Sequence, residues 1–246
     1  MRQSLSQQLR DVRDVLRWRG PFRFLLLVVR EVLSPFVYWH VYDIFEKDLR
    51  QPIPESYARG EFEIRIYKGS EDLERLGNEL TSMGELAPIE IKARFGRGDI
   101  VAVAYAGQKA TGYLWLTFLS GMHLGFGTSW MVHSHEAVRY GMFVLPQWRG
   151  RGISSLLNHA VNVHAREHGI IRTLASISVL NNPSLSLPKH YGTAPSMKVI
   201  IFRVRGVNWT YRKAIGARLD SRFSKLASWP APSCVNSFDT DEPRRT

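Results

Sequence analysis

The stretch FVLPQWRGRGIS, residues 143–154, places an apolar run, a proline, two arginines and two glycines directly before an amphipathic segment. A β-segment followed at once by a helix directs several unpaired backbone N–H groups at one point. Gly150 and Gly152 let the backbone approach an anion closely, and Arg149 and Arg151 add positive charge beside it. These residues therefore predict a corner that binds phosphate groups.

Two common phosphate-binding loops fit this stretch poorly. A P-loop needs Gly-Lys-Ser or Gly-Lys-Thr, which the sequence lacks, and the pattern G-x-G-x-x-G fails because Ser155 stands at the third glycine. The segment Gln147–Gly152, QWRGRG, instead resembles the acyl-CoA pyrophosphate loop Q/R-x-x-G-x-G/A of the GNAT superfamily of N-acyltransferases. Val144 and Pro146 precede it, as is common in that family. The order of the expected elements extends the resemblance over about residues 61–212.

The resemblance implies that acetyl-CoA or another acyl-CoA is the co-substrate, with no metal. The coenzyme would lie between a strand that ends at Leu145 and a strand that ends at Leu180, which is followed by the family-like Asn-x-x-Ser of residues 181–184. Backbone groups of residues 143–145 would pair with the pantetheine arm, and the following amides would hold the pyrophosphate. The residues expected to contact the coenzyme are Phe143, Val144, Leu145, Gln147, Trp148, Arg149, Gly150, Arg151, Gly152, Ile153, Ser154, Asn181 and Ser184.

Direct acyl transfer to an amine needs a deprotonated amine, a polarised thioester carbonyl and a protonated leaving thiolate. Glu136 is the candidate base, because it stands just before the strand that should carry the coenzyme. The position at which many relatives keep an acidic tyrosine is Pro188 here, which departs from the family pattern. Tyr191, about one turn later, is the candidate acid, and Ser184, His190 or water are the alternatives.

The acceptor side is less defined. Trp115, Trp130 and Tyr140 fall near the expected acceptor face and could floor a substrate pocket, while the alternative is that they pack in the core. His133 and His135 have a spacing that metal sites use, but no third ligand is evident, so no metal site is predicted.

Composition limits the partners. Lysine and arginine number 33 against 22 acidic residues, a formal net charge of +11, which favours phosphates, acidic molecules or an anionic membrane surface. Nucleic acid is disfavoured, because no basic and aromatic stripe or recognition helix is evident. The one cysteine, Cys234, excludes a disulfide framework and a cysteine metal cluster, which fits a reducing cytoplasm. A non-catalytic module that binds anions or nucleic acid is kept as an alternative function.

The expected fold class is α/β (α+β), with a GNAT-type, mixed and mostly antiparallel central sheet, flanking helices and an N-terminal helical extension. Residues 1–50 are expected to form that extension, with a third helix over residues 36–49, and two prolines mark a linker at residues 51–60. The acyltransferase domain is expected at residues 61–212, and residues 213–246 as a polar tail.

Within the expected domain, alternating runs predict strands and serine or proline starts predict helices. A strand at residues 62–69, two helical segments over 70–95 and a hairpin at 99–118 around Gly107 come first. The sequence then predicts a loop at 120–136, a strand to Leu145, a helix from about Ile153 to Gly169, a strand at 170–180, a short helix with Asn182 as its N-cap, and closing strands to residue 212.

Residues 18–45 are unusually apolar and aromatic. They would pack on the domain, pair with another subunit in a homodimer, or lie on a membrane surface. The apolar run Phe24–Val29 is too short to span a bilayer, so the expected location is the cytoplasm, with peripheral contact at the inner face of the membrane left open. In that setting the runner-up function is an N-acyl amino acid synthase that takes its acyl group from an acidic carrier protein.

Overall fold

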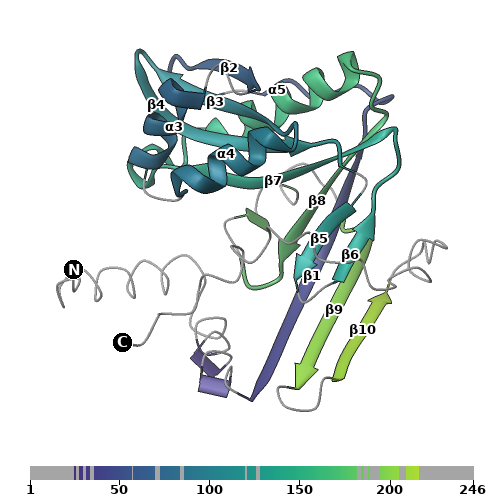
Figure 1. Cartoon of the computed structure of the whole chain (residues 1–246). Helices are drawn as coiled ribbons and strands as arrows, with labels where there is room; N and C mark the ends of the chain where they lie inside the picture. Colours follow the sequence, from purple (N-terminus) through teal and green to yellow (C-terminus); the bar gives the residue numbers. More distant parts are fainter. Residues whose placement is uncertain are drawn as a thin grey trace. The chain divides into compact units, whose positions relative to one another are not determined.

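The computed structural model describes residues 25, 28–29, 32–33, 36–56, 58–69, 73–83, 86–119, 121–125, 128–181, 184–185, 188, 194–204 and 209–215 (Figure 1). These residues fall into two compact units. One unit holds those up to Phe45 together with those from Ser176 on, and the other holds Glu46–Ala175. The phosphate-binding corner lies in the second unit.

A mixed, mostly antiparallel sheet is the framework of the second unit. Its strands neighbour one another in the order β2 (Glu63–Lys68), β3 (Ile100–Ala106), β4 (Lys109–Thr117), β7 (Glu136–Val144) and the first residues of β8 (Arg172–Ser178). The first four are antiparallel to their neighbours, and β8 runs parallel to β7. This sheet, with helices on both faces, confirms the predicted fold class.

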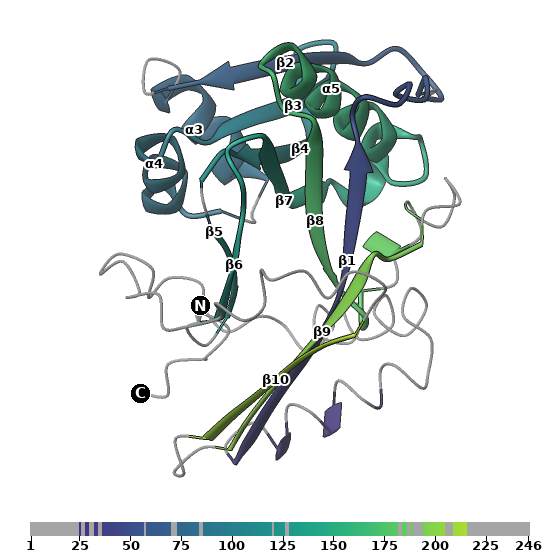
Figure 2. The ribbon, with the colours of Figure 1, turned by 90° about the vertical axis from the view of Figure 1, so that its right-hand side faces the viewer.

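Alternate residues of a strand point to opposite faces, so each strand feeds two apolar clusters. Ala102 and Ala104 of β3 pack on one face, and Val101 and Val103 pack on the other. Figures 1 and 2 show the helices on these faces: α5 on the first, and α3 with α4 on the second. Their bounds are α3 (Leu73–Ser82), α4 (Pro88–Gly96) and α5 (Ile153–Glu167).

Helix α5 forms because apolar residues recur every four positions along it. Ile153, Leu157, Val161 and Ala165 are all buried in the first cluster, and most of the intervening positions are more exposed, apart from the buried Asn162 and His164. The predicted hairpin is also confirmed, with Gly107 in its turn at a φ of 59°. The segment expected as a loop at residues 120–136 is instead largely extended: β5 (Gly121–Gly125) pairs with β6 (Thr128–Met131), because the loop closes on itself as a second hairpin.

The first unit corrects the prediction for residues 36–49. This segment is not a helix but strand β1 (Val37–Asp48), which pairs antiparallel with β9 (Met197–Val204), and β9 pairs with β10 (Trp209–Ile215). The segment is rich in valine, isoleucine and aromatic residues, which favour strands, and pairing with a distant partner strand satisfies its backbone. Strand β10 also extends the ordered chain past residue 212.

Residues 25, 28–29 and 32–33 are helical, as expected for that part of the extension. The remaining helical predictions for residues 1–24, the N-cap prediction for Asn182 and the tail beyond Ile215 lie outside the described residues. Among the helices that the structure describes, none is both long and apolar enough to cross a membrane.

Candidate functional site

The corner predicted from residues 143–154 has the expected backbone path. Strand β7 ends at Val144, a 3₁₀ turn covers Pro146–Trp148, and α5 begins at Ile153. Gly150 and Gly152 adopt φ values of 78° and 86°, in the left-handed region that favours glycine. Both glycines are therefore needed to fold the chain back into the helix.

The backbone N–H groups of this corner are available. Those of Trp148 and Arg149 donate within the 3₁₀ turn. Within the described part of the chain, no hydrogen bond uses the N–H groups of residues 150–154. They stand at the positive end of a 15-residue helix, where an anion is stabilised.

The corner packs against the rest of the protein through Trp148 and Arg151, and the space beside Gly150 is open. The indole of Trp148 packs edge-on against Phe62 at 5.8 Å between ring centroids, and the guanidinium of Arg151 lies 4.8 Å from the Trp148 ring. The N–H of Arg59 donates to the carbonyl of Arg151 at 2.8 Å. A Cβ added to Gly150 would meet no atom within 4 Å, so no side chain fills the space before it.

Arg149 does not point away from the protein. Its Nε donates to the carbonyl of Val144 at 3.0 Å, and its guanidinium lies 6.0 Å from the Phe143 ring. The N–H of Leu145 donates to the carbonyl of Thr111. A pantetheine arm that paired with Val144 would therefore compete with Arg149 for the Val144 carbonyl.

The middle of β7 has an unpaired side. β7 pairs with β8 only from Glu136 to Val138, and from Arg139 on it pairs with β4 alone among the described strands. Trp115 of β4 opposes Tyr140, whereas Tyr113 opposes Phe143, so β7 carries an extra residue between these pairs. This β-bulge includes Gly141, which is exposed and has a φ of 58°. A bulge leaves backbone groups without partners in the ladder.

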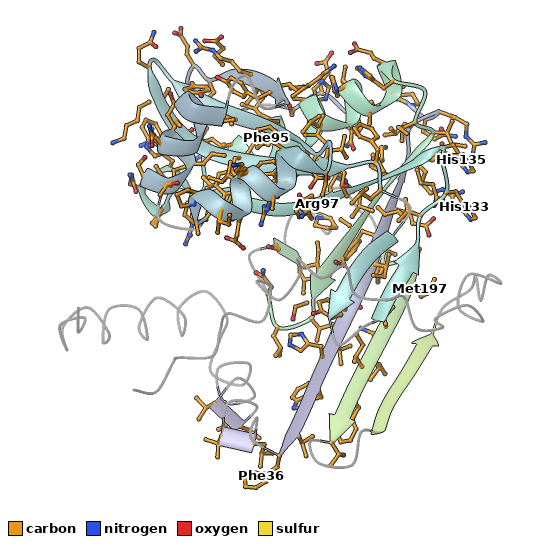
Figure 3. All side chains as sticks on the ribbon, in the orientation of Figure 1. Phe36, Phe95, Arg97, His133, His135 and Met197 are labelled. Atoms are coloured by element: carbon orange, nitrogen blue, oxygen red, sulfur yellow. The ribbon has the colours of Figure 1, made fainter. Side chains whose placement is uncertain are left out.

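The opposite face of the bulge is packed by α4. The guanidinium of Arg94 on α4 lies 5.1 Å from the ring centroids of both Trp115 and Tyr140, and the Tyr140 hydroxyl donates to Oδ2 of Asp99 at 2.7 Å. Arg97, labelled in Figure 3, donates to the same oxygen at 2.8 Å. Burial, and then the charge of Asp99, raise the pKa of Tyr140 above its usual value.

These contacts place the predicted acceptor residues. Trp115 is fully buried, in T-shaped contact with Phe95 at 5.2 Å, and therefore packs in the core, which is the alternative that the sequence left open. Tyr140 is partly exposed beside the bulge. The side chain of Trp130 lies outside the described residues.

Arg139 connects β7 to the first turns of α5. Its Nη1 donates to Oδ1 of Asn158 at 2.7 Å, and Nδ2 of Asn158 donates to the carbonyl of Ser154 at 2.8 Å. Burial lowers the pKa of Arg139 to about 10. This chain of contacts fixes the start of α5, and with it the corner, relative to the strand.

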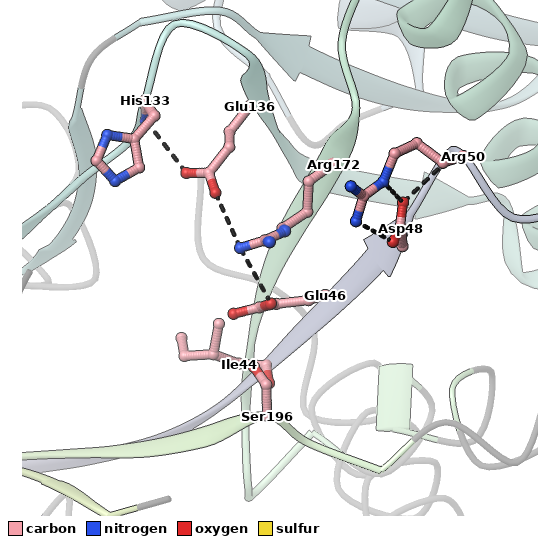
Figure 4. A network of polar contacts seen from close by, with 8 residues as sticks. All are labelled: Ile44, Glu46, Asp48, Arg50, His133, Glu136, Arg172 and Ser196. Atoms are coloured by element: carbon pink, nitrogen blue, oxygen red, sulfur yellow. Dashed lines mark hydrogen bonds and ion pairs between the residues drawn. The ribbon is translucent and has the colours of Figure 1, made fainter. Parts of the chain in front are cut away.

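Glu136, the predicted base, is buried at the start of β7. Its carboxylate accepts a hydrogen bond from the His133 N–H at 3.1 Å and pairs with Nη1 of Arg172 at 3.2 Å (Figure 4). Arg172 also lies 3.5 Å from Glu46. These contacts hold the carboxylate between two strands and a turn.

The remaining predicted residues are placed in part. His133 and His135 are exposed with their rings stacked at 5.6 Å, and no group of three or more metal-ligating side chains occurs among the described residues (Figure 3). Oδ1 of Asn181, in the first unit, accepts the Ser184 N–H at 3.3 Å and so caps the helical turn that follows. Tyr191 lies outside the described residues.

A cavity of about 340 Å³ adjoins the corner on the face that α3 covers. Leu145 and Gln147 line it, with the last turn of α3 and the β3–β4 turn. The sequence analysis identified neither this cavity nor the roles of four polar residues: Arg94, Asp99, Arg139 and Asn158. For the three charged residues, a signal was available, because each is a charged residue in a largely apolar segment.

Residues 81–192 match the model of the acetyltransferase (GNAT) family. No curated protein matches the chain. Among solved structures, a functionally unknown conserved protein from Staphylococcus epidermidis is 10% identical, and the match covers 72% of this chain and 66% of that chain with a TM-score of 0.48.

Two further structures are similar in the same sense. An acetyltransferase of the GNAT family from Colwellia psychrerythraea is 14% identical over 72% of this chain and 61% of that chain, with a TM-score of 0.48. The aminoglycoside N-acetyltransferase AAC(6′)-Iy, in complex with a bisubstrate analogue, is 19% identical over 55% of this chain and 92% of that chain, with a TM-score of 0.44. The matches thus span less than two thirds of the length of the proteins from Staphylococcus epidermidis and Colwellia psychrerythraea. Residues 81–192 are therefore similar to the acetyltransferase (GNAT) family.

Proposed function

We propose that this protein transfers an acetyl group, or another acyl group, from acyl-CoA to an amine of a small-molecule acceptor. The observation that carries the proposal is the corner at residues 150–154, whose backbone N–H groups form no hydrogen bond within the described part of the chain and whose front is open at Gly150. A diphosphate needs such a set of converging donors. The family match supplies the acyl-transfer chemistry.

The reacting end of the donor would lie along β7. From the corner, the strand leads back through Phe143 to the bulge at Gly141, roughly 3.3 Å per residue. On this stretch β7 has no partner on the β8 side among the described strands. Its N–H groups can therefore donate hydrogen bonds to a bound pantetheine arm, as they would to a neighbouring strand. The thioester carbonyl would then meet the bulge.

The reaction proceeds in one displacement. The nitrogen lone pair of the acceptor amine attacks the thioester carbon, the carbon–sulfur bond breaks, and the new amide and the thiolate separate. The nitrogen gives up one proton and the thiolate takes one, so that an amide and a free thiol are the products. A backbone N–H aimed at the carbonyl oxygen stabilises the negative charge that grows there.

The groups that move these protons stay predictions. Glu136 is the base suggested by the sequence, and its partners Arg172 and the His133 N–H support a second role, in which it fixes the start of β7. Tyr191 stays the candidate acid. Among the predicted acceptor residues, Tyr140 is the one whose described side chain reaches the surface beside the bulge.

The N-terminal helical residues support a peripheral contact. Leu25, Val28, Val29, Val32 and Leu33 repeat at helical spacing and are 40% to 68% exposed, and Phe36 beside them is 69% exposed (Figure 3). An exposed apolar stripe on a chain with a formal charge of +11 fits an anionic lipid surface. We therefore propose that this stripe contacts a membrane surface. The test of this proposal also distinguishes the alternative, in which the stripe binds a second copy of the chain.

The test of the proposed function is calorimetry with CoA and acetyl-CoA. Gly150→Glu places a bulky anion in front of the N–H groups and should abolish binding. Gly169→Glu is the matched control, because Gly169 has a φ of 77°, has open space around it, and lies beyond the other end of α5. Unchanged CoA binding in Gly150→Glu, or equal loss in both variants, would contradict the assignment of the corner.

A further inference from the structure

The β7 bulge is shaped from the α4 side by one buried cation. Arg94 is 4% exposed, and its guanidinium lies 5.1 Å from the ring centroids of both Trp115 and Tyr140. A Cβ built on Gly141 would lie 2.9 Å from Nη1 of Arg94 and 3.3 Å from Cδ1 of Trp115. Gly141 therefore allows a close approach between Arg94 and the strand backbone.

The rings around Arg94 are themselves fixed. Asp99 is 1% exposed and its Oδ2 accepts hydrogen bonds from the Tyr140 hydroxyl at 2.7 Å and from Arg97 at 2.8 Å. Burial and Asp99 raise the pKa of Tyr140, so its hydroxyl keeps its proton and keeps donating. Trp115 is held on its other side by Phe95. The guanidinium thus lies in a slot lined by two rings, each of which contacts a further side chain.

The edge of β7 that faces β8 does not fix the bulge within the described strands, because the pairing with β8 ends at Val138. On the α5 face, Met142 of the bulge contacts Nδ2 of Asn158 at 3.5 Å, and on the α4 face the bulge meets Arg94. A glycine populates positive and negative φ about equally well, so the packing around Gly141 must select its φ of 58°. On the α4 face, Arg94 and Trp115 occupy the space beside Gly141 and contribute to this selection. Burying a guanidinium is costly unless its planar shape and charge are used, and here the rings of Trp115 and Tyr140 use them.

We propose that Arg94 is a positioning residue, which holds the bulge at Gly141 in the conformation that directs a backbone N–H at the thioester carbonyl. This inference rests on the proposed function. It assigns Arg94 no contact with the substrate, and it separates two tasks within the site: the corner at residues 150–154 binds the diphosphate, and the slot around Arg94 sets the geometry at the acyl group.

The separation can be measured without knowing the acceptor. CoA and acetyl-CoA share the diphosphate contacts, and only acetyl-CoA has the thioester carbonyl. In the unchanged protein, acetyl-CoA should bind more tightly than CoA by about 2-fold to 12-fold, the factor that one hydrogen bond supplies. In Arg94→Met this ratio should fall to about 1, while the affinity for CoA changes by less than about 2-fold.

Three further proteins complete the experiment. Arg94→Lys keeps the charge without the planar stacking and should restore part of the ratio. Arg166→Met, on the exposed surface of α5, removes the same charge and should keep the whole ratio. Gly141→Ala should reproduce the effect of Arg94→Met from the strand side, and it serves as the test if Arg94→Met does not fold.

A spectroscopic reading makes the cause specific. Infrared difference spectra of bound acetyl-CoA labelled with ¹³C at the carbonyl should show a stretch shifted to lower frequency in the unchanged protein and not in Arg94→Met. A folded Arg94→Met that keeps both the ratio and the shift would overturn the inference. Failure of the unchanged protein to bind CoA at all would instead overturn the proposed function.

Discussion

The guanidinium of Arg139 donates a hydrogen bond to the side-chain oxygen of Asn158, 2.7 Å away, and thereby connects the middle of β7 to the second turn of α5. Asn158→Leu removes the acceptor and leaves a buried cation without it, so the free energy of unfolding should fall by about 1–3 kcal/mol. Urea denaturation measures this change. Arg166→Leu, exposed on the same helix, should stay within about 0.5 kcal/mol of the unchanged protein. A loss in Asn158→Leu no larger than in this control would show that the contact does not stabilise the helix.

The lowered pKa of His164 should make the free energy of unfolding depend on pH. Burial, followed by the charges of His168 and Lys68, lowers its pKa from 6.5, while Glu167 acts in the opposite direction. The folded state therefore favours neutral His164, and the stability from this group is complete above pH 6.5 and falls as the pH drops below that value. His164→Gln should flatten the decline of unfolding free energy between about pH 7 and about pH 5. The same substitution at His135, which is exposed, should leave the slope unchanged.

Glu136→Gln distinguishes a base from a residue that holds β7. The amide keeps an oxygen for the His133 N–H but loses the ion pair with Arg172, so the free energy of unfolding should fall by about 1–3 kcal/mol. Because these partners already occupy the carboxylate, we expect the acidic limb of the kcat profile against pH to persist. Acetylation of pooled amines with labelled acetyl-CoA gives the profile. Disappearance of that limb, with normal CoA affinity, would instead establish Glu136 as the base.

The apolar stripe predicts lipid binding. Val32→Glu and Phe36→Glu place anions on side chains that are 68% and 69% exposed, and should reduce sedimentation with vesicles rich in phosphatidylglycerol. Ile89→Glu is the matched control, since Ile89 is 70% exposed on α4 in the other unit. Binding that is unchanged in both stripe variants would contradict the membrane proposal. A shift from dimer to monomer in light scattering without vesicles would assign the stripe to a second copy of the chain.

The two parts of the site were not equally readable from the sequence. The corner depends on local chemistry: Gly150 and Gly152 have to adopt positive φ, and the following helix start leaves its N–H groups unpaired. Both properties depend on a few consecutive residues, so a short sequence motif is enough to predict them. The slot around Arg94 brings α4 and Asp99 together with β4 and β7, which lie further along the chain, and no spacing pattern in the sequence predicts these contacts.

The prediction for residues 36–49 was wrong for a related reason. Apolar and aromatic residues there were compatible with a short buried helix, and periodicity does not separate that case from a strand. Pairing with β9, more than 150 positions away in the chain, decided the outcome for β1. The segment at residues 120–136 was predicted as a loop but contains β5 and β6. Hydrogen bonds between its two halves stabilise these strands, and no sequence pattern predicted that pairing.

By itself, the sequence determined the glycine-containing corner before α5, the alternation that builds β3 and β4, and the family that residues 81–192 resemble. These features arise from neighbouring residues, whose steric and hydrogen-bonding demands are the same wherever the chain goes. The tertiary structure alone decided that Trp115 is core, that Glu136 is paired with Arg172, and that Arg94 occupies the space beside Gly141. Such contacts depend on which distant elements share a face of the sheet, and packing fixes that choice only when the whole domain has assembled.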